Sequence, residues 1–150
     1  MVDYCWKTGK VPSNIPVRQV YGVAFSDDGK VLLRVEDGEY KLTGGKPEGK
    51  ETFADTLKRE YLEELNVEVD DISYLGYLLV RDGEAEYAQV RMIARIRKIN
   101  EARPDADNGK LYGRKLAKPD DVKGLLGYSD EAGNLMIDSA IERAKQLSLI

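Results

Sequence analysis

The chain has 150 residues, of which 42% are hydrophobic and 33% are charged, and its formal net charge of −4 accompanies an isoelectric point near 5.0. This length favours one domain spanning residues 1–150, and no apolar run approaches the roughly 18 residues that a membrane span requires. The acidic balance argues against a nucleic-acid polymer as the partner, and the single Cys5 cannot form an internal disulfide, so we expect a reducing, cytoplasmic location.

Short strands and turns fill the first part of the chain. Residues 1–16 contain Pro12 and Pro16, and we expect an irregular lead-in with at most one short strand. Alternating apolar residues and turns rich in Asp and Gly then predict three strands, at 17–25, 30–35 and 39–42. The last of these leads into Gly44 and Gly45, which predict a tight turn.

An amphipathic helix is predicted from about Thr52. Apolar residues recur there at every fourth position, at Phe53, Leu57, Tyr61 and Leu65. At about 100° per residue, Glu64 falls inside this apolar arc and Glu60 at its edge. Together with Glu63 they form a patch of like charges at helical spacing, which repel one another. A cation must compensate, and a hard divalent ion bound by carboxylate oxygens, such as Mg²⁺, is the simplest candidate.

Downstream of this helix the pattern returns to strands. Residues 67–80 indicate one strand or a bent pair around Asp70 and Asp71, and 87–99 indicate a long strand with a basic face that includes Arg91. That face is either solvated or in contact with phosphate. The remaining predicted elements are a loop at 101–113, a strand at 114–117, a helix from Pro119 to near Gly124 and an amphipathic helix over 135–147. Helices alternating with groups of strands predict a mixed sheet with helices on both faces.

The run from Gly45 to Val67 resembles the sequence box of the Nudix hydrolases. That box reads G, five residues, E, seven residues and R-E-U-x-E-E-x-G-U, where U is a bulky aliphatic residue. Every charged position matches, whereas Tyr61 replaces an aliphatic residue and Asn66 replaces the glycine that ends the helix. Asn is the next-best residue at a left-handed helix C-terminus. The resemblance implies an α/β fold, namely a Nudix-type α/β/α sandwich with a mixed β-sheet between helices.

The resemblance also implies a role for each matching residue. The metal ligands would be the carbonyl of Gly45 and three carboxylates, those of Glu60, Glu63 and Glu64. Glu51 and Arg59 would support these ligands and complete the catalytic set. Mg²⁺ is the expected ion, and Mn²⁺ is the alternative.

The implied reaction is hydrolysis of a nucleoside diphosphate linked to another group X, by attack of a metal-activated water on phosphorus. The partner is then a small nucleotide-type molecule: a nucleoside triphosphate, a nucleotide sugar or a dinucleoside polyphosphate. We expect a monomer or a homodimer. The alternative function is a non-catalytic nucleotide-binding sensor of the same fold.

The sequence leaves alternatives open for the substrate contacts and for the general base. Tyr40 either stacks on a nucleobase or packs within its strand. The residues expected at the substrate are Tyr40, Gly44, Gly45 and Arg91. The general base is either a glutamate of the box or an acidic residue downstream of it, and the downstream candidates are Glu84, Glu86, Asp105 and Asp107.

Overall fold

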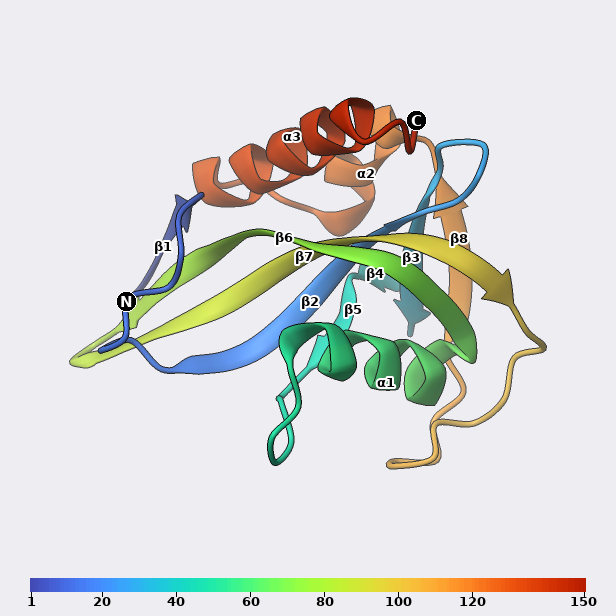
Figure 1. The fold of residues 1–150 in the computed structure, drawn as a ribbon, viewed down its shortest axis with the longest axis horizontal. Helices are drawn as coiled ribbons and strands as arrows, with labels where there is room; N and C mark the ends of the chain where they lie inside the picture. Colours follow the sequence, from blue (N-terminus) through green and yellow to red (C-terminus); the bar gives the residue numbers. More distant parts are fainter.

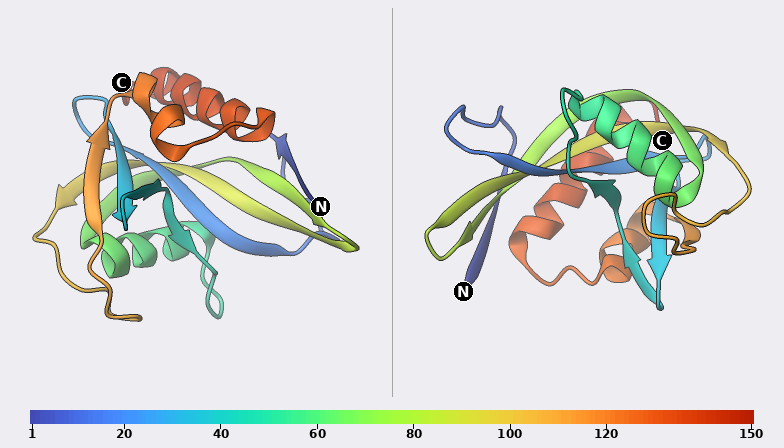
Figure 2. Two further views of the ribbon diagram at one scale, coloured as in Figure 1. Left: turned by 180° about the vertical axis from the view of Figure 1, so that it is seen from behind. Right: turned by 90° about the horizontal axis from the view of Figure 1, so that it is seen from below.

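A twisted mixed sheet separates one helix from two others in the computed structural model, which describes all residues 1–150 (Figure 1). Helix α1 (Phe53–Leu65) covers one face, and helices α2 (Pro119–Leu126) and α3 (Glu131–Gln146) cover the other, as the two further views in Figure 2 also show. This arrangement confirms the α/β/α sandwich expected from the sequence.

The sheet has eight strands in the order β1-β6-β7-β2-β3-β4, with β5 paired to β2 and β8 paired to β3. The strands are β1 (Val2–Lys7), β2 (Val17–Phe25), β3 (Val31–Glu36), β4 (Glu39–Lys41), β5 (Thr43–Gly45), β6 (Val67–Asp82), β7 (Ala85–Ile99) and β8 (Gly113–Ala117). The central pair β2–β7 is parallel, and all the other pairs are antiparallel. The sheet is therefore mixed, as predicted.

Alternate residues of the central strands supply the cores on the two sides of the sheet. On β2, Val20 and Ala24 pack in the cluster that includes Leu57 of α1. Val23 and Phe25 point the other way, into the cluster that includes Met136 and other residues of α3. A strand buried on both faces reads as a nearly continuous apolar run, which matches the sequence of β2.

The prediction that Gly44 and Gly45 form a tight turn is wrong, because both lie in strand β5, where Gly44 pairs with Tyr21 of β2. A Cβ atom on Gly44 would lie 2.1 Å from the carbonyl oxygen of Val20, and one on Gly45 would lie 2.4 Å from Oε1 of Glu60. Glycine is needed at both positions for close approach.

Three smaller differences concern the bounds of elements. The irregular lead-in is limited to 8–16, because Val2–Lys7 form β1 along β6. Residues 67–80 belong to the single strand β6, which bends where its register to β7 shifts between Asp70 and Ser73. Helix α2 continues to Leu126, since the left-handed residue that ends it is Gly127 (φ 71°).

Both departures from the Nudix box fit the fold. Tyr61 is fully buried, and its hydroxyl donates a hydrogen bond of 3.2 Å to the carbonyl of Gly22. A side chain at Gly22 would collide with the Tyr61 ring, so this glycine makes room for the tyrosine. Asn66 adopts the left-handed conformation (φ 53°, ψ 46°) at the end of α1, as expected.

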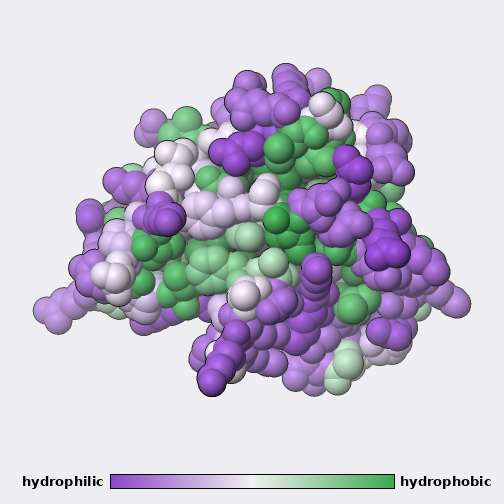
Figure 3. All heavy atoms as spheres, in the orientation of Figure 1, coloured by the Kyte–Doolittle hydropathy of each residue, from purple (hydrophilic) through white to green (hydrophobic).

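The surface seen in Figure 3 is mostly hydrophilic, with apolar side chains gathered over the sheet between α3 and α1. No helix combines the length and the apolar character that crossing a bilayer requires. The helices instead bury one side against the sheet and keep a polar side in water, which is the pattern of amphipathic helices in a layered fold.

Replacing Gly44 by Ala should destabilise the protein, because the new methyl group would have to displace the backbone of β2. We expect the free energy of unfolding, measured by urea titration, to fall by about 3 kcal/mol. The control is Gly124→Ala in α2, where no atom lies within 4 Å of the added Cβ, and which should leave stability unchanged or slightly raised. Equal effects of the two changes would contradict the close approach.

Candidate active site

Arg59 on the polar side of α1 holds the carboxylates of the box. Its Nε lies 2.7 Å from Oε2 of Glu51 and its Nη2 3.0 Å from Oε1, a bidentate pair. Its Nη1 donates to Glu60 at 2.9 Å and to Glu63 at 3.2 Å. The arginine beside it holds the pKa of Glu51 at about 2, so this carboxylate stays ionised. Arg59 therefore contacts Glu51 and two of the expected metal ligands.

Glu64 has a different cationic partner. It is buried, and its Oε1 accepts a hydrogen bond of 2.7 Å from Nη1 of Arg34 on β3. Its Oε2 is also buried but has no hydrogen-bond partner. Burial raises the pKa of Glu64 to about 8; Arg34 opposes this shift, whereas the negative charges of Glu60 and Asp105 add to it. The site thus carries more negative charge than its arginines neutralise.

Glu60 lies between these groups. Its carboxylate packs directly against the backbone of Gly45, so the helix and strand β5 meet at this point. Burial raises the pKa of Glu60, although Arg59 lowers it. The structure therefore brings Gly45, Glu60, Glu63 and Glu64 to one end of the contact between β5 and α1.

These carboxylates are not arranged as a ready metal site. No group of three or more Asp, Glu, Cys or His side chains has the geometry to hold an ion. Glu60 and Glu63 turn to Arg59, and Glu64 turns to Arg34. The donor set nevertheless fits Mg²⁺, because it consists of hard oxygen atoms, one of which is buried without a partner. Each of these carboxylates contacts its arginine through one oxygen, which leaves its second oxygen for an ion.

Of the downstream candidates for the general base, Asp105 is the one whose charge acts on the glutamates of the box. It is buried in the loop between β7 and β8, and its negative charge raises the pKa of both Glu60 and Glu64. Its Oδ1 accepts the backbone N–H of Asp107 at 2.7 Å, which fixes the loop. The carboxylate is therefore held in a constrained turn.

Glu84 and Glu86 lie elsewhere. They belong to the hairpin that joins β6 to β7, whose tip is at the end of the sheet away from β8 and the loop of Asp105 in both Figure 1 and Figure 2. Glu86 pairs with Arg81 of the same hairpin at 2.7 Å. Neither residue is brought to the box.

A pocket of about 310 Å³ adjoins the carboxylates, since Arg34 lines it and also binds Glu64. Its other lining residues are Tyr21, Tyr40, Lys41, Leu42, Gln89, Arg91, Leu126 and Tyr128. We call it the tyrosine pocket. Arg91, predicted on a basic strand face, is buried here and is not solvated.

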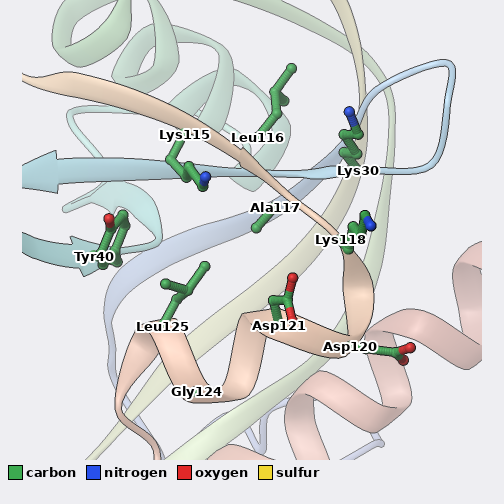
Figure 4. Close-up of a pocket in the computed structure, with 10 residues that line it drawn as sticks. All are labelled: Lys30, Tyr40, Lys115, Leu116, Ala117, Lys118, Asp120, Asp121, Gly124 and Leu125. Atoms are coloured by element: carbon green, nitrogen blue, oxygen red, sulfur yellow. The ribbon is translucent and has the colours of Figure 1, made fainter.

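Tyr40 lines the tyrosine pocket and also a second hollow of about 610 Å³ on its other side. Figure 4 shows this second hollow between α2 and strands β3 and β8, with Lys30, Lys115 and Lys118 along it. The tyrosine is half-buried between the two spaces. Its position is compatible with the predicted contact to a flat substrate group.

Sequence reasoning missed Arg34, Tyr21 and Tyr128. The only local signal for Arg34 is a basic residue inside the apolar run of β3. Tyr21 and Tyr128 come from distant parts of the chain, and only the folded sheet brings them to Arg91. No spacing rule in the sequence connects these residues to the box.

Comparison with known proteins decides the family. Residues 16–132 match the family model described as the NUDIX domain. The chain belongs to the Nudix family. This confirms the resemblance of the box and the enzyme class that it implied, a hydrolase of phosphoric anhydrides. No curated protein matches the Nudix chain described here.

Solved Nudix structures share this fold. The Bacillus subtilis pyrophosphohydrolase BsRppH superposes with a TM-score of 0.73 at 22% identity, over 93% of this chain and 90% of that one. The MutT protein of Bacillus halodurans gives 0.63 at 23% identity, over 83% and 81% of the two chains. A Nudix hydrolase from Nitrosomonas europaea gives 0.63 at 18% identity, over 83% and 87%.

The Arg34–Glu64 pair should be strongly coupled in the metal-free protein. Arg34→Met leaves a buried carboxylate alone and Glu64→Leu leaves a buried guanidinium alone, so each should lower the free energy of unfolding by about 3 kcal/mol. The double variant should recover most of that loss. Urea titrations in a chelator test this, with Glu86→Gln of the exposed Arg81 pair as a control expected to change little. Purely additive losses would contradict the pairing.

Proposed function

We propose that this Nudix protein is a Mg²⁺-dependent pyrophosphohydrolase, which cleaves a nucleoside diphosphate linked to another group X. The observation that carries the proposal is the excess of carboxylates at the end of α1, where Glu64 is buried with one oxygen unpartnered beside Glu60. Such a site gains stability from a bound cation and thereby becomes able to receive phosphate oxygens. The similarity in fold to BsRppH, a pyrophosphohydrolase, supports the same reaction class.

The ligands proposed for the ion are Glu60, Glu63, Glu64 and the carbonyl of Gly45, with Mn²⁺ as the alternative to Mg²⁺. When bound, the ion would polarise the phosphoryl group and acidify the attacking water. Arg59, held by Glu51, orients Glu60 and Glu63 while they bind. Arg34 holds Glu64 in the same way from the sheet.

Asp105 is our proposed general base. Its Oδ1 is engaged by backbone N–H groups of its own loop, so the carboxylate is fixed in place and its other oxygen is available to accept a proton from water. Its negative charge also raises the pKa of Glu60 and Glu64, which supports a position near the proposed ligands. Asp107 is exposed and instead donates its backbone N–H to Asp105.

The remaining parts of the proposal concern the setting of the reaction. The partner is a small nucleotide-type molecule rather than a nucleic-acid polymer, and the protein acts in the cytoplasm as a monomer or a homodimer. The tyrosine pocket, which Arg34 joins to the carboxylates, would hold the part of the substrate away from the reacting phosphate. A sensor that binds nucleotide without turnover is the competing function; a phosphate-release screen with and without Mg²⁺ separates the two.

Changing Glu64 to Gln should nearly abolish hydrolysis. The amide keeps the shape of the side chain but removes a negative ligand, and we expect Mg²⁺-dependent turnover to fall by at least about 10²-fold. Phosphate release over a nucleotide panel measures the loss, and circular dichroism checks that the fold remains. Glu142→Gln, an exposed change on α3, is the matched control and should keep full activity. Wild-type turnover by the Glu64→Gln variant would refute the metal role of this residue.

Changing Asp105 to Asn should remove the proposed general base but keep the hydrogen bond that fixes its loop. Asn keeps an oxygen that accepts the N–H of Asp107, so the loop should remain in place while the base is lost. We expect kcat to fall by about 10²-fold with little change in nucleotide binding, as measured by steady-state kinetics beside calorimetry. Glu84→Gln and Glu86→Gln serve as controls and should be fully active. Loss of activity in either control, with Asp105→Asn unaffected, would move the role to the hairpin.

A further inference from the structure

Arg91 is a buried cation without a carboxylate partner. Only 5% of the residue is exposed, and its Nε has no hydrogen-bond partner. Its Nη1 makes one long contact of 3.5 Å with the carbonyl of Gln89. Burial lowers the pKa of Arg91, and this shift is opposed by the phenols of Tyr21 and of Tyr128, the second of which also hydrogen-bonds to Arg91. Both phenols are neutral at pH 7. Burying a charge without a counter-charge is costly, so the fold leaves this guanidinium under-satisfied.

The space around Arg91 has an aromatic lining. Its guanidinium lies 4.6 Å from the centroid of the Tyr21 ring, and Tyr40 and Tyr128 complete the aromatic lining of the tyrosine pocket. Aromatic side chains favour stacking with planar groups. The volume of about 310 Å³ is far more than a phosphate ion needs. No acidic residue lines the pocket, so its polar groups are chiefly hydrogen-bond donors.

The pocket also lies in the right place for one end of the proposed substrate. The aromatic lining belongs to the cluster under α2 and α3, and Arg34, which lines the pocket and contacts Glu64 at 2.7 Å, connects it to the proposed reaction centre. Lys41, the last residue of β4, adds a third cation to the pocket beside Arg34 and Arg91. A nucleotide with its base in the pocket would direct its phosphates toward the carboxylates and their ion.

We propose that the tyrosine pocket binds the nucleobase of the substrate and that Arg91 makes it selective for guanine-type bases. This inference rests on the proposed function for the phosphate chemistry. Guanine and hypoxanthine present two adjacent acceptors, O6 and N7, which match the paired donors of a guanidinium. Adenine presents a donor beside its N7, and cytosine presents a donor at N4, so each would place an N–H group against Arg91.

Binding of nucleoside monophosphates tests this selectivity without any hydrolysis, because these molecules have no phosphoric anhydride to cleave. NMR titration of the metal-free protein with GMP, IMP and AMP should show GMP and IMP binding about tenfold or more tighter than AMP. Inorganic phosphate should compete poorly. Equal binding of GMP and AMP, or full displacement of GMP by phosphate, would overturn the proposal; the second result would make the pocket a simple anion site.

Variants of Arg91 test its role directly. Arg91→Met fills a similar volume without charge, and it should remove the preference for GMP over AMP while leaving the melting temperature unchanged or raised. Arg91→Lys keeps the charge without the paired donors, so the preference should also fall in this variant. It serves as the test if the Met variant fails to fold. Arg95→Met, on the same strand but at a more exposed position, should keep the full preference. If both Arg91 variants kept the preference for GMP, the role of Arg91 in base selectivity would be contradicted.

The failure of this inference can be told apart from failure of the proposed function. Glu64→Gln should retain the preference for GMP even though it is expected to lose hydrolysis, since the base lies on the other side of Arg34. If the wild type bound GMP selectively but hydrolysed no nucleotide, the assignment of the pocket would stand and the proposed reaction would be contradicted. If the wild type hydrolysed nucleotides but showed no base preference, the proposed reaction would stand and the assignment of the pocket would be contradicted.

Discussion

The site depends on the close approach of strands β2 and β5 to each other and to helix α1, which glycines in the two strands make possible. Gly44 lies against the backbone of β2, and Gly45 lies against the carboxylate of Glu60. Gly22 on β2 in turn leaves room for the ring of Tyr61, which anchors α1 to the sheet. Because backbone is rigid and cannot rotate away as a side chain does, these contacts fix the depth at which α1 sits and with it the position of its glutamates.

Charge is organised around that contact from two directions. Arg59 approaches the glutamates from within the helix, whereas Arg34 reaches Glu64 from the sheet. Each arginine holds carboxylates in place, yet the pKa values of Glu60 and Glu64 stay raised, chiefly because of burial and also because of neighbouring negative charges. The arrangement keeps the carboxylates close to one another and leaves them responsive to an added cation.

The helix, its capping and the box were predictable because each is a local property. The spacing of apolar residues predicts α1, and Asn66 ends it in the conformation that its side chain favours. The two glycines before it misled the prediction, since glycine serves both tight turns and close approach, and the sequence does not say which. Arg34, Arg91 and Asp105 reach the site only through sheet pairing and loop packing, which no local pattern encodes.

The parallel pairing of β2 with β7 has a kinetic consequence. Val17 lies opposite Ala88, and Phe25 lies opposite Arg95. The centre of the sheet therefore joins two segments that are separated in the sequence by helix α1 and four strands, β3 to β6. Pairings this distant in sequence carry a large loop-closure entropy and form slowly. During synthesis on a ribosome, α1 would emerge well before β7, the strand that completes the sheet beneath it. Until the chain has been made as far as Arg95, Tyr61 and the glutamates of α1 would remain exposed to solvent. Assembly of this site is therefore a late event in folding, and delay there would expose apolar strand edges to aggregation.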